Sequence, residues 1–153
     1  MYTNCHIISR DICISSAHTK RMVIKFLIYG ALGWFMEIIW TGLGSLLRRD
    51  FKLHASTSIW MLFIYGMAVF VEPVCDMMRQ LPLIARGAAY VLCFFAIEFA
   101  TGAVLKKARV CPWDYSGSKF NLFGLIRFDY APVWFLAGLV FERVHFVVGR
   151  YIA

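Results

Sequence analysis

The sequence predicts an all-α, polytopic membrane protein whose helices form one transmembrane bundle of about four spans. Of its 153 residues, 61% are hydrophobic and 17% are aromatic, and the mean hydropathy is +0.67. Only 16% are charged, against about 25% in an average soluble domain. The apolar residues gather in long runs with basic residues at their ends, which is how a membrane protein brackets its spans.

Residues 1–21 are mixed and polar, without a helical period, and we expect a loosely ordered N-terminal tail there. Residues 22–151 form a single transmembrane domain, and its first helix is predicted at 22–47. This helix contains 12 Val, Ile, Leu or Phe residues, each contributing about −0.3 to −0.6 kcal/mol to insertion. Together they outweigh the cost of Glu37 near the centre, which is about 3 kcal/mol.

Three more membrane helices are predicted at 58–75, 87–105 and 131–148. The third contains Glu98, and the fourth is interrupted by Glu142. The uninterrupted apolar stretch of the fourth helix is shorter than the ~20 residues that a span needs. With four spans, both termini should lie on the same side of the membrane.

The charge pattern excludes nucleic acid as a partner and favours the lipid bilayer. The net charge is +7, but no basic stripe with room for a groove exists. The basic residues instead stand at the ends of the apolar runs: Lys20, Arg21, Arg48, Arg49, Arg86, Lys106, Lys107 and Arg143. No two of the five cysteines have the spacing of a zinc or redox pair. No cofactor motif appears, and no nucleophile with a partnered base, so neither a cofactor nor an enzymatic activity is expected.

Carboxylates inside the predicted spans are the main candidates for function. Such groups are costly in hydrocarbon and should face the bundle interior or a wet cavity. On a helical wheel, Glu37 lies on a small and polar face with Gly30, Gly33, Thr41 and Gly44. Larger apolar residues form the opposite face, which is expected to meet lipid: Ile28, Leu32, Phe35, Ile39, Leu43 and Leu46.

The third and fourth helices carry similar polar faces, and the third is expected to touch neighbours on two sides. The candidate interior polar site consists of Glu37, Thr41, Glu98, Thr101 and Glu142. It would bind a cation, relay protons or hold a polar substrate; alternatively, the same groups only lock the helices together. Glu142 and His145 have the Glu-x-x-His spacing of di-iron bundles, which need two copies. Only one copy is present, so no metal site is predicted.

A weak internal repeat relates the two halves of the chain. Tyr29 precedes Glu37 by eight residues, and Tyr90 precedes Glu98 by eight. A Thr-Gly pair follows each glutamate. The first two and the last two helices would then be parallel repeats; the alternative is coincidence in a sequence of low complexity.

The longest connection, residues 106–130, is too apolar in its second half for an ordinary solvated loop. Trp and Tyr favour the headgroup level of a bilayer, so we expect the loop to lie at or dip into the interface. It is either an anchor or a gate or binding loop. Its candidate residues are Trp113, Asp114, Tyr115, Ser116, Asn121 and Gly124.

Several of these motifs together resemble the putative ABC-transporter type IV membrane family, and most closely its transmembrane protein 229 branch. The resemblance covers about residues 26–142. It rests on Gly33-Trp34 with Glu37, Trp60 with Phe63-Ile64-Tyr65-Gly66, Glu98 with Thr101-Gly102, and Pro112-Trp113-Asp114-Tyr115-Ser116 with Asn121 and Gly124. The closer match to the branch lies in residues 57–66 and 125–131. Many bacterial members have Arg where this chain has Leu125, so no role of that Arg carries over.

The resemblance implies a small multi-pass membrane protein related to transport. The chain has no Walker-type nucleotide motif, so it would be a membrane subunit working with another membrane subunit or an ATPase. In such a transport protein, Glu37 and Glu98 would line the path of the substrate. The alternative is a non-catalytic scaffold or regulator. A polar cavity that reaches one surface favours transport, and a dry, packed interior favours the scaffold.

Overall fold

The computed structural model describes the backbone of residues 3–152, with side chains for residue 16 and residues 18–152. Four described segments are long and apolar enough to cross a membrane: His18–Leu47, Ile59–Met77, Leu83–Lys107 and Phe128–Tyr151. The predicted all-α class with four membrane helices is confirmed. The elements are α1 (Thr3–Leu47), α2 (Ile59–Gly66), η1 (Met67–Val71), α3 (Glu72–Met77), α4 (Leu83–Lys107), β1 (Asn121–Leu122), β2 (Ile126–Arg127), η2 (Phe128–Tyr130) and α5 (Ala131–Tyr151).

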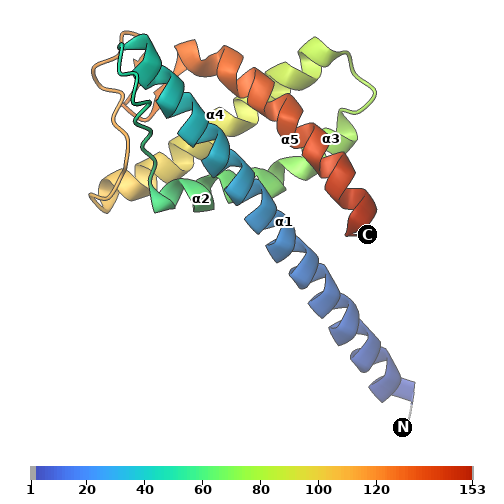
Figure 1. Cartoon of the computed structure of the whole chain (residues 1–153). Helices are drawn as coiled ribbons and strands as arrows, with labels where there is room; N and C mark the ends of the chain where they lie inside the picture. Colours follow the sequence, from blue (N-terminus) through green and yellow to red (C-terminus); the bar gives the residue numbers. More distant parts are fainter. Residues whose placement is uncertain (1–2, 153) are drawn as a thin grey trace.

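The first helix is much longer than the predicted span. α1 begins at Thr3 and runs for 45 residues, and its N-terminal half projects away from the other helices (Figure 1). Its backbone therefore includes most of the segment that was expected to be a loosely ordered tail. No Gly or Pro precedes Gly30, so nothing in the chain interrupts a helix that continues backward from the apolar span.

The second span is a broken helix rather than a continuous one. α2 begins after Ser58, whose side chain accepts a hydrogen bond from the Trp60 N–H at 3.3 Å. The tighter 3₁₀ helix η1 follows Gly66 and leads into α3, where Pro73 occupies the first turn. Pro73 has no N–H to donate to the preceding turn, so the chain changes helix type just before it.

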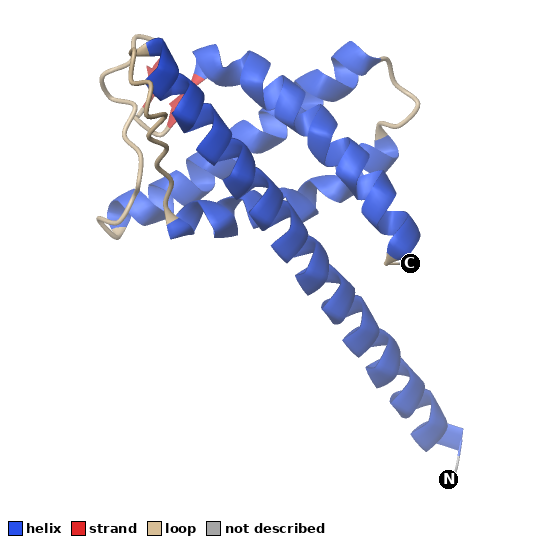
Figure 2. Ribbon diagram, viewed as in Figure 1, coloured by secondary structure: helices blue, strands red, loops and turns tan. Residues whose placement is uncertain are grey.

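The helices pack as two hairpins, α1 against α2 and α4 against α5, with α4 also in contact with α2 and α3. In Figure 1 the C-terminal ends of α1 and α4 lie toward the left, and the start of α4 lies at the right. Both ends of the chain point toward the lower right in that view. Figure 2 shows the loops gathered mainly at the left end. This arrangement fits the prediction that both termini share one side of a membrane.

The core consists largely of aromatic side chains between the two hairpins. Tyr29 and Tyr90 are almost completely buried, and Phe94 and Phe141 pack beside them. Small residues allow this close packing, because a side chain at Gly138 would overlap the Tyr90 ring. The core therefore depends on a ring of one helix fitting over a glycine of its neighbour.

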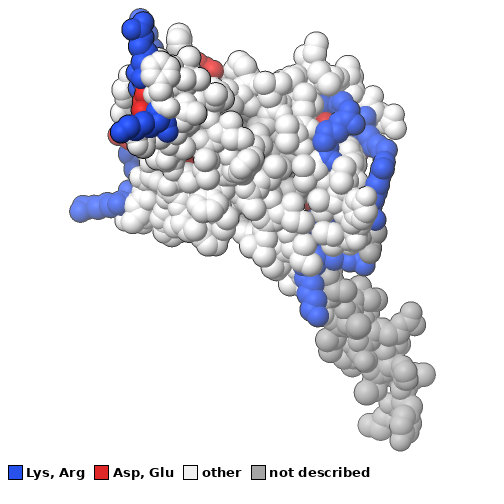
Figure 3. All heavy atoms as spheres, viewed as in Figure 1, with Lys and Arg blue, Asp and Glu red and all other residues white. Residues whose placement is uncertain are grey.

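The outer surface matches a bilayer better than water. Lys and Arg side chains gather at the two ends, with a broad uncharged band between them (Figure 3). On α1 the predicted apolar face is exposed at Phe35, Ile39, Leu43 and Leu46. Ile28 and Leu32 of the same face instead pack against the core, because α1 is covered by neighbours in that part of its length.

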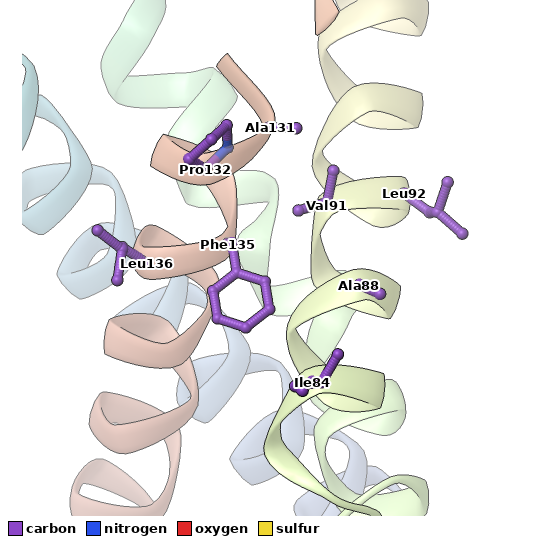
Figure 4. A pocket seen from close by; sticks show the side chains of 8 residues that line it. All are labelled: Ile84, Ala88, Val91, Leu92, Ala131, Pro132, Phe135 and Leu136. Atoms are coloured by element: carbon purple, nitrogen blue, oxygen red, sulfur yellow. The ribbon is translucent and has the colours of Figure 1, made fainter. Parts of the chain in front are cut away.

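One face of α4 differs from the expectation of neighbours on two sides. Ala96, Ala100 and Ala103 are exposed within the described part of the chain. An apolar groove also runs between α4 and α5 (Figure 4). Its lining residues are Ile84, Ala88, Val91, Leu92, Ala131, Pro132, Phe135 and Leu136. In a bilayer this side of the bundle faces lipid chains or another protein.

Candidate functional site

A cavity of about 560 Å³ lies among α1, α2, α4, α5 and the connection between α4 and α5. Its mouth lies beside the C-terminal end of α1, where exposed Leu47, Arg48 and His54 line it. Its inner end is formed by buried Ala137 and Phe141 of α5. The volume is in the range of small-molecule sites, which is about 300–1,000 Å³. The interior of the bundle is thus hollow at one end and packed at the other.

Two carboxylates from different hairpins share this cavity, Glu37 of α1 and Glu98 of α4. Glu98 is only 7% exposed. Oε2 of each glutamate is buried and has no hydrogen-bond partner among the described residues. Neither carboxylate is within ion-pair distance of a described Lys, Arg or His. Buried acidic groups without a partner are costly. A proton or a cation bound in the cavity would therefore stabilise the two glutamates.

Polar side chains, most of them aromatic, lie around the two glutamates. Tyr65 of α2 and Thr57 lie next to the Glu37 carboxylate. Tyr115 and Trp134 lie next to that of Glu98. Their O–H and N–H groups are the nearest protein donors, although none of them satisfies the free Oε2 atoms.

Thr41 fixes the rim of the cavity. Its hydroxyl donates to the Glu37 carbonyl oxygen at 2.9 Å, and its oxygen accepts from the Ser56 N–H at 3.2 Å. One helical turn further on, Ser45 donates to the His54 carbonyl oxygen. These two hydroxyls hold the segment between α1 and α2 against the end of α1. The mouth therefore has a rim held by hydrogen bonds.

Residues 113–125, in the connection between α4 and α5, are held together by hydrogen bonds; we call this segment the platform. Trp113 Nε1 donates to the Leu125 carbonyl oxygen at 2.9 Å, and Asn121 Oδ1 accepts from the Gly124 N–H at 2.9 Å. Asp114 Oδ1 accepts from both the N–H and the hydroxyl of Ser116, at 3.0 and 2.6 Å. These bonds also lower the pKa of the exposed Asp114 carboxyl group.

The short antiparallel pair β1–β2 closes this platform with a tight turn. Phe123 and Gly124 both have positive φ angles, 54° and 69°, as in type I′ turns. At Gly124 a side chain would also collide with the Ser116 hydroxyl. This explains why the motif has glycine at that position. The membrane depth of the loop stays a prediction.

Tyr115 is the motif residue that reaches the cavity. Its N–H donates to the Gly124 carbonyl oxygen at 2.9 Å, while its ring lies 5.9 Å from that of Tyr130, centroid to centroid. Burial, and then the nearby charge of Glu98, raise the pKa of the Tyr115 hydroxyl well above its usual value. The platform thus holds a protonated phenol beside Glu98.

The structure does not bring all the predicted interior residues together. Glu37, Thr41 and Glu98 line the cavity. Thr101 donates to the Ile97 carbonyl oxygen of its own helix at 2.7 Å and does not line the cavity. Glu142 does not line the cavity either. Its Oε1 is instead bound by Arg86 Nη1 at 2.9 Å.

A second polar cluster lies beyond the inner end of the cavity. Lys25 Nζ binds Glu72 Oε2 at 2.8 Å, and the Tyr29 hydroxyl donates to Glu72 Oε1. His145 contacts both Glu72, at 3.3 Å, and Asp76, at 3.0 Å. His145 therefore pairs with carboxylates of α3 rather than forming a Glu-x-x-His metal site with Glu142.

This cluster extends the internal repeat. Lys25 stands four residues before Tyr29, and Arg86 stands four residues before Tyr90. Each basic residue binds a glutamate of the span that follows it, Glu72 for Lys25 and Glu142 for Arg86. The same basic, Tyr and Glu pattern therefore occurs in α1 and α4. Contacts of the same kind are made in both hairpins, which favours a repeat over coincidence.

The sequence analysis did not single out Trp40 and Trp134 of the cavity, and it included Tyr65 and Tyr130 only as part of the family resemblance. With 17% aromatic residues in the chain, no local pattern marks these four as cavity residues. Arg86 stood out only as a basic residue at the end of an apolar run, and its acidic partner Glu142 was not predicted.

Comparison with known proteins identifies one family. Residues 24–152 match the sequence model described as putative ABC-transporter type IV. The match includes both cavity glutamates and the platform motif. No solved structure matches the chain.

Proposed function

Because the chain belongs to the putative ABC-transporter type IV family, we propose that it is the membrane-spanning component of a transport system. In this role the cavity holds the substrate, and Glu37 and Glu98 line its path. The observation that carries the proposal is the shared cavity, into which two unpaired carboxylates from different hairpins project and which opens at one end. Two shielded carboxylates without an ion-pair partner are costly to keep for a purely structural role.

The closed inner end of the cavity supports the same role. The Phe141 ring packs against those of Tyr29 and Phe94, at centroid distances of 5.7 and 5.5 Å. Behind this layer lie the ion pairs Lys25–Glu72 and Arg86–Glu142. A carrier needs an access path that is open on one side and closed on the other, and transporters built from repeats place their site between the repeats.

We further infer that the chain belongs to the transmembrane protein 229 branch of the family. Residues 57–66 and 125–131 carry that likeness. Both segments adjoin the cavity, through Tyr65 in one and Tyr130 in the other.

The proposal requires a partner that supplies energy, since the chain has no Walker-type nucleotide motif. The test is to purify the full chain in nanodiscs and ask whether an ATP-hydrolysing protein co-purifies. The ATPase activity of that complex is then compared for wild type, Glu37→Gln and Glu98→Gln. We expect both variants to insert and bind the partner but to lose substrate-stimulated hydrolysis.

The matched control is Thr101→Ala. Thr101 lies one turn from Glu98, bonds only to its own helix and does not line the cavity. It should leave stimulation unchanged. If the amide variants keep full stimulation, or if no ATP-hydrolysing partner binds the wild-type chain, the proposal is wrong.

A scaffold or regulatory role is the second candidate. One observation favours it: Ala96, Ala100 and Ala103 form an exposed small-residue face on α4, and such faces allow helices of another protein to approach closely. Under that role Glu37→Gln and Glu98→Gln would be tolerated, while Ala100→Leu would abolish association.

A further inference from the structure

We propose that the cavity binds an organic ammonium ion, held by the Glu37 and Glu98 carboxylates and by the faces of the aromatic rings around them. The inference rests on the proposed function, because it names the class of ligand for the same cavity. Four observations carry it: unpaired negative charge, lack of a competing cation, aromatic walls and size.

The negative charge comes first. Among the described acidic side chains, Asp50, Glu72, Asp76, Asp129 and Glu142 have ion-pair partners, and the exposed Asp114 accepts two hydrogen bonds from Ser116. Glu37 and Glu98 have no ion-pair partner. Glu98 is nevertheless only 7% exposed, and its Oε2 has no hydrogen-bond partner among the described residues. Besides hydrogen bonds from neighbouring side chains, a charge that deep needs a nearby cation, or the carboxylate takes up a proton.

The basic residues near the cavity do not fill this role. Arg48 stands at the mouth, exposed, and contacts the Ser45 hydroxyl at 3.3 Å. His54, also at the mouth, is bound to Asp50 at 2.6 Å. The negative charge of Glu37 and Glu98 therefore remains free for a ligand.

The walls are aromatic on two sides. On one side Trp40 and Tyr115 each meet Tyr130 edge to face, with ring centroids 5.9 Å apart in both pairs. On the other side Tyr65 and Trp134 lie 6.2 Å apart. All five rings line the cavity. Rings of Trp and Tyr attract cations over their faces, and cages of such rings recognise quaternary ammonium groups.

One of these rings already shows that attraction within the chain. The Arg127 guanidinium carbon lies 4.4 Å from the centroid of the Tyr130 ring. No other cation among the described residues lies over the remaining four rings, and of these Trp134 has one face stacked on Phe94, at a centroid distance of 5.1 Å.

Size distinguishes an organic ion from a bare metal ion. The cavity volume of about 560 Å³ suits a molecule of several heavy atoms. No three His, Cys, Asp or Glu side chains of the described residues converge closely enough to hold a metal ion. An ammonium ion with an apolar body fits both the volume and the aromatic walls.

The test is a titration of the full chain, purified in a detergent that has no ammonium headgroup. Choline chloride is added at constant ionic strength, and tryptophan emission is followed, because Trp40 and Trp134 line the cavity. The matched ligand is dimethylbutanol, which has the shape of choline with carbon in place of the charged nitrogen. We expect saturable binding of choline and none of the alcohol. No binding of either, or equal binding of both, would overturn the inference.

Variants locate the site. Glu98→Gln should weaken choline binding by on the order of 30-fold, as expected when one partner of a buried charge pair is lost. Trp134→Phe should weaken it about three- to thirtyfold. Trp60→Phe makes the same change at a ring outside the cavity, and Glu72→Gln removes a half-buried carboxylate that already has a partner. Equal weakening by the controls and the cavity variants would contradict the assignment.

The ammonium group has two sources, a free small molecule or a phospholipid headgroup. Nanodiscs of phosphatidylcholine and of phosphatidylglycerol separate them. A lipid source predicts that choline binds only in phosphatidylglycerol, because phosphatidylcholine already fills the site; a free ligand predicts equal binding in both. If choline fails to bind in every setting while the ATPase partner still co-purifies, the ligand class is wrong and the proposed function stands. If choline binds but no ATPase co-purifies with the chain, the ligand class stands and only the proposed function is wrong.

Discussion

The ion pair between Arg86 and Glu142 offers a sharp test of how α4 and α5, the two helices of one hairpin, are joined at the closed end. Arg86 lies in the first turn of α4 and Glu142 lies in α5, with their charged atoms 2.9 Å apart. Their side chains are 19% and 6% exposed. Removing Glu142 leaves a largely buried guanidinium without a partner, which costs about 3–5 kcal/mol in buried pairs. Since Arg86 keeps some contact with solvent, we expect Glu142→Leu to cost about 3 kcal/mol of unfolding free energy.

Removing both charges should restore most of that loss. In Arg86→Met/Glu142→Leu no buried charge remains, and apolar side chains of similar volume fill the space. We expect this double variant to lie within about 1 kcal/mol of wild type. The control is Arg150→Met, which removes an exposed cation near the end of α5 and should change stability by less than about 1 kcal/mol.

The assay is reversible unfolding of the purified chain in mixed micelles with increasing SDS, followed by tryptophan fluorescence. Wild type, the two single variants Arg86→Met and Glu142→Leu, and the double variant give a double-mutant cycle from which the coupling energy follows. The reasoning is refuted if Glu142→Leu is as stable as wild type. It is also refuted if the double variant is less stable than the single one.

Three further predictions concern the ends of the chain and the loop. Cysteine-accessibility labelling at residues 3 and 152 should modify both from the same side of sealed vesicles; labelling from opposite sides would contradict the four-span topology. In intact vesicles the platform loop should resist protease, and lipids carrying a quencher in the headgroup should quench Trp113; cleavage at residues 111–128 would argue against an interfacial loop. Finally, the raised pKa of Tyr115 means that its stabilising contribution is complete below the unfolded value of about 10 and falls as the pH rises beyond it. Tyr115→Phe should therefore flatten the alkaline fall in thermal stability, and an unchanged fall would show that Tyr115 does not cause it.

The spans were predictable because insertion into a membrane depends on local composition. The runs around Glu37 and Glu98 carry enough large apolar residues to outweigh each charge. The break in the second span was not predicted, because helix type there depends on how Gly66 and Pro73 pack as well as on their identity. The helical course of residues 3–21 was missed because that segment lacks an apolar period and simply continues α1.

The candidate site could be predicted only at residues whose side chains cost much free energy to bury. Glu37 and Glu98 stood out because carboxylates are rare inside spans, and the wheel placed each on an inward face. Glu142 stood out for the same reason, but its assignment to the same site overlooked Arg86, a partner 56 positions earlier in the chain. Trp134 could not be found at all, and Tyr65 was named only within the family motif, since aromatic side chains are favourable almost anywhere in a bundle. Only the fold decides which rings face the cavity.

The central claim is that Glu37 and Glu98 point into one shared space between the two hairpins. The most direct measurement is cross-linking of Glu37→Cys/Glu98→Cys, in a chain whose five native cysteines are replaced, by a short bis-maleimide in detergent. The control pairs Glu37→Cys with Ala103→Cys, which lies on the exposed face of α4. The shared cavity predicts rapid intramolecular cross-linking of the first pair and none of the second. If the first pair stays unlinked while both cysteines still react with a monofunctional maleimide, the two carboxylates do not share a cavity.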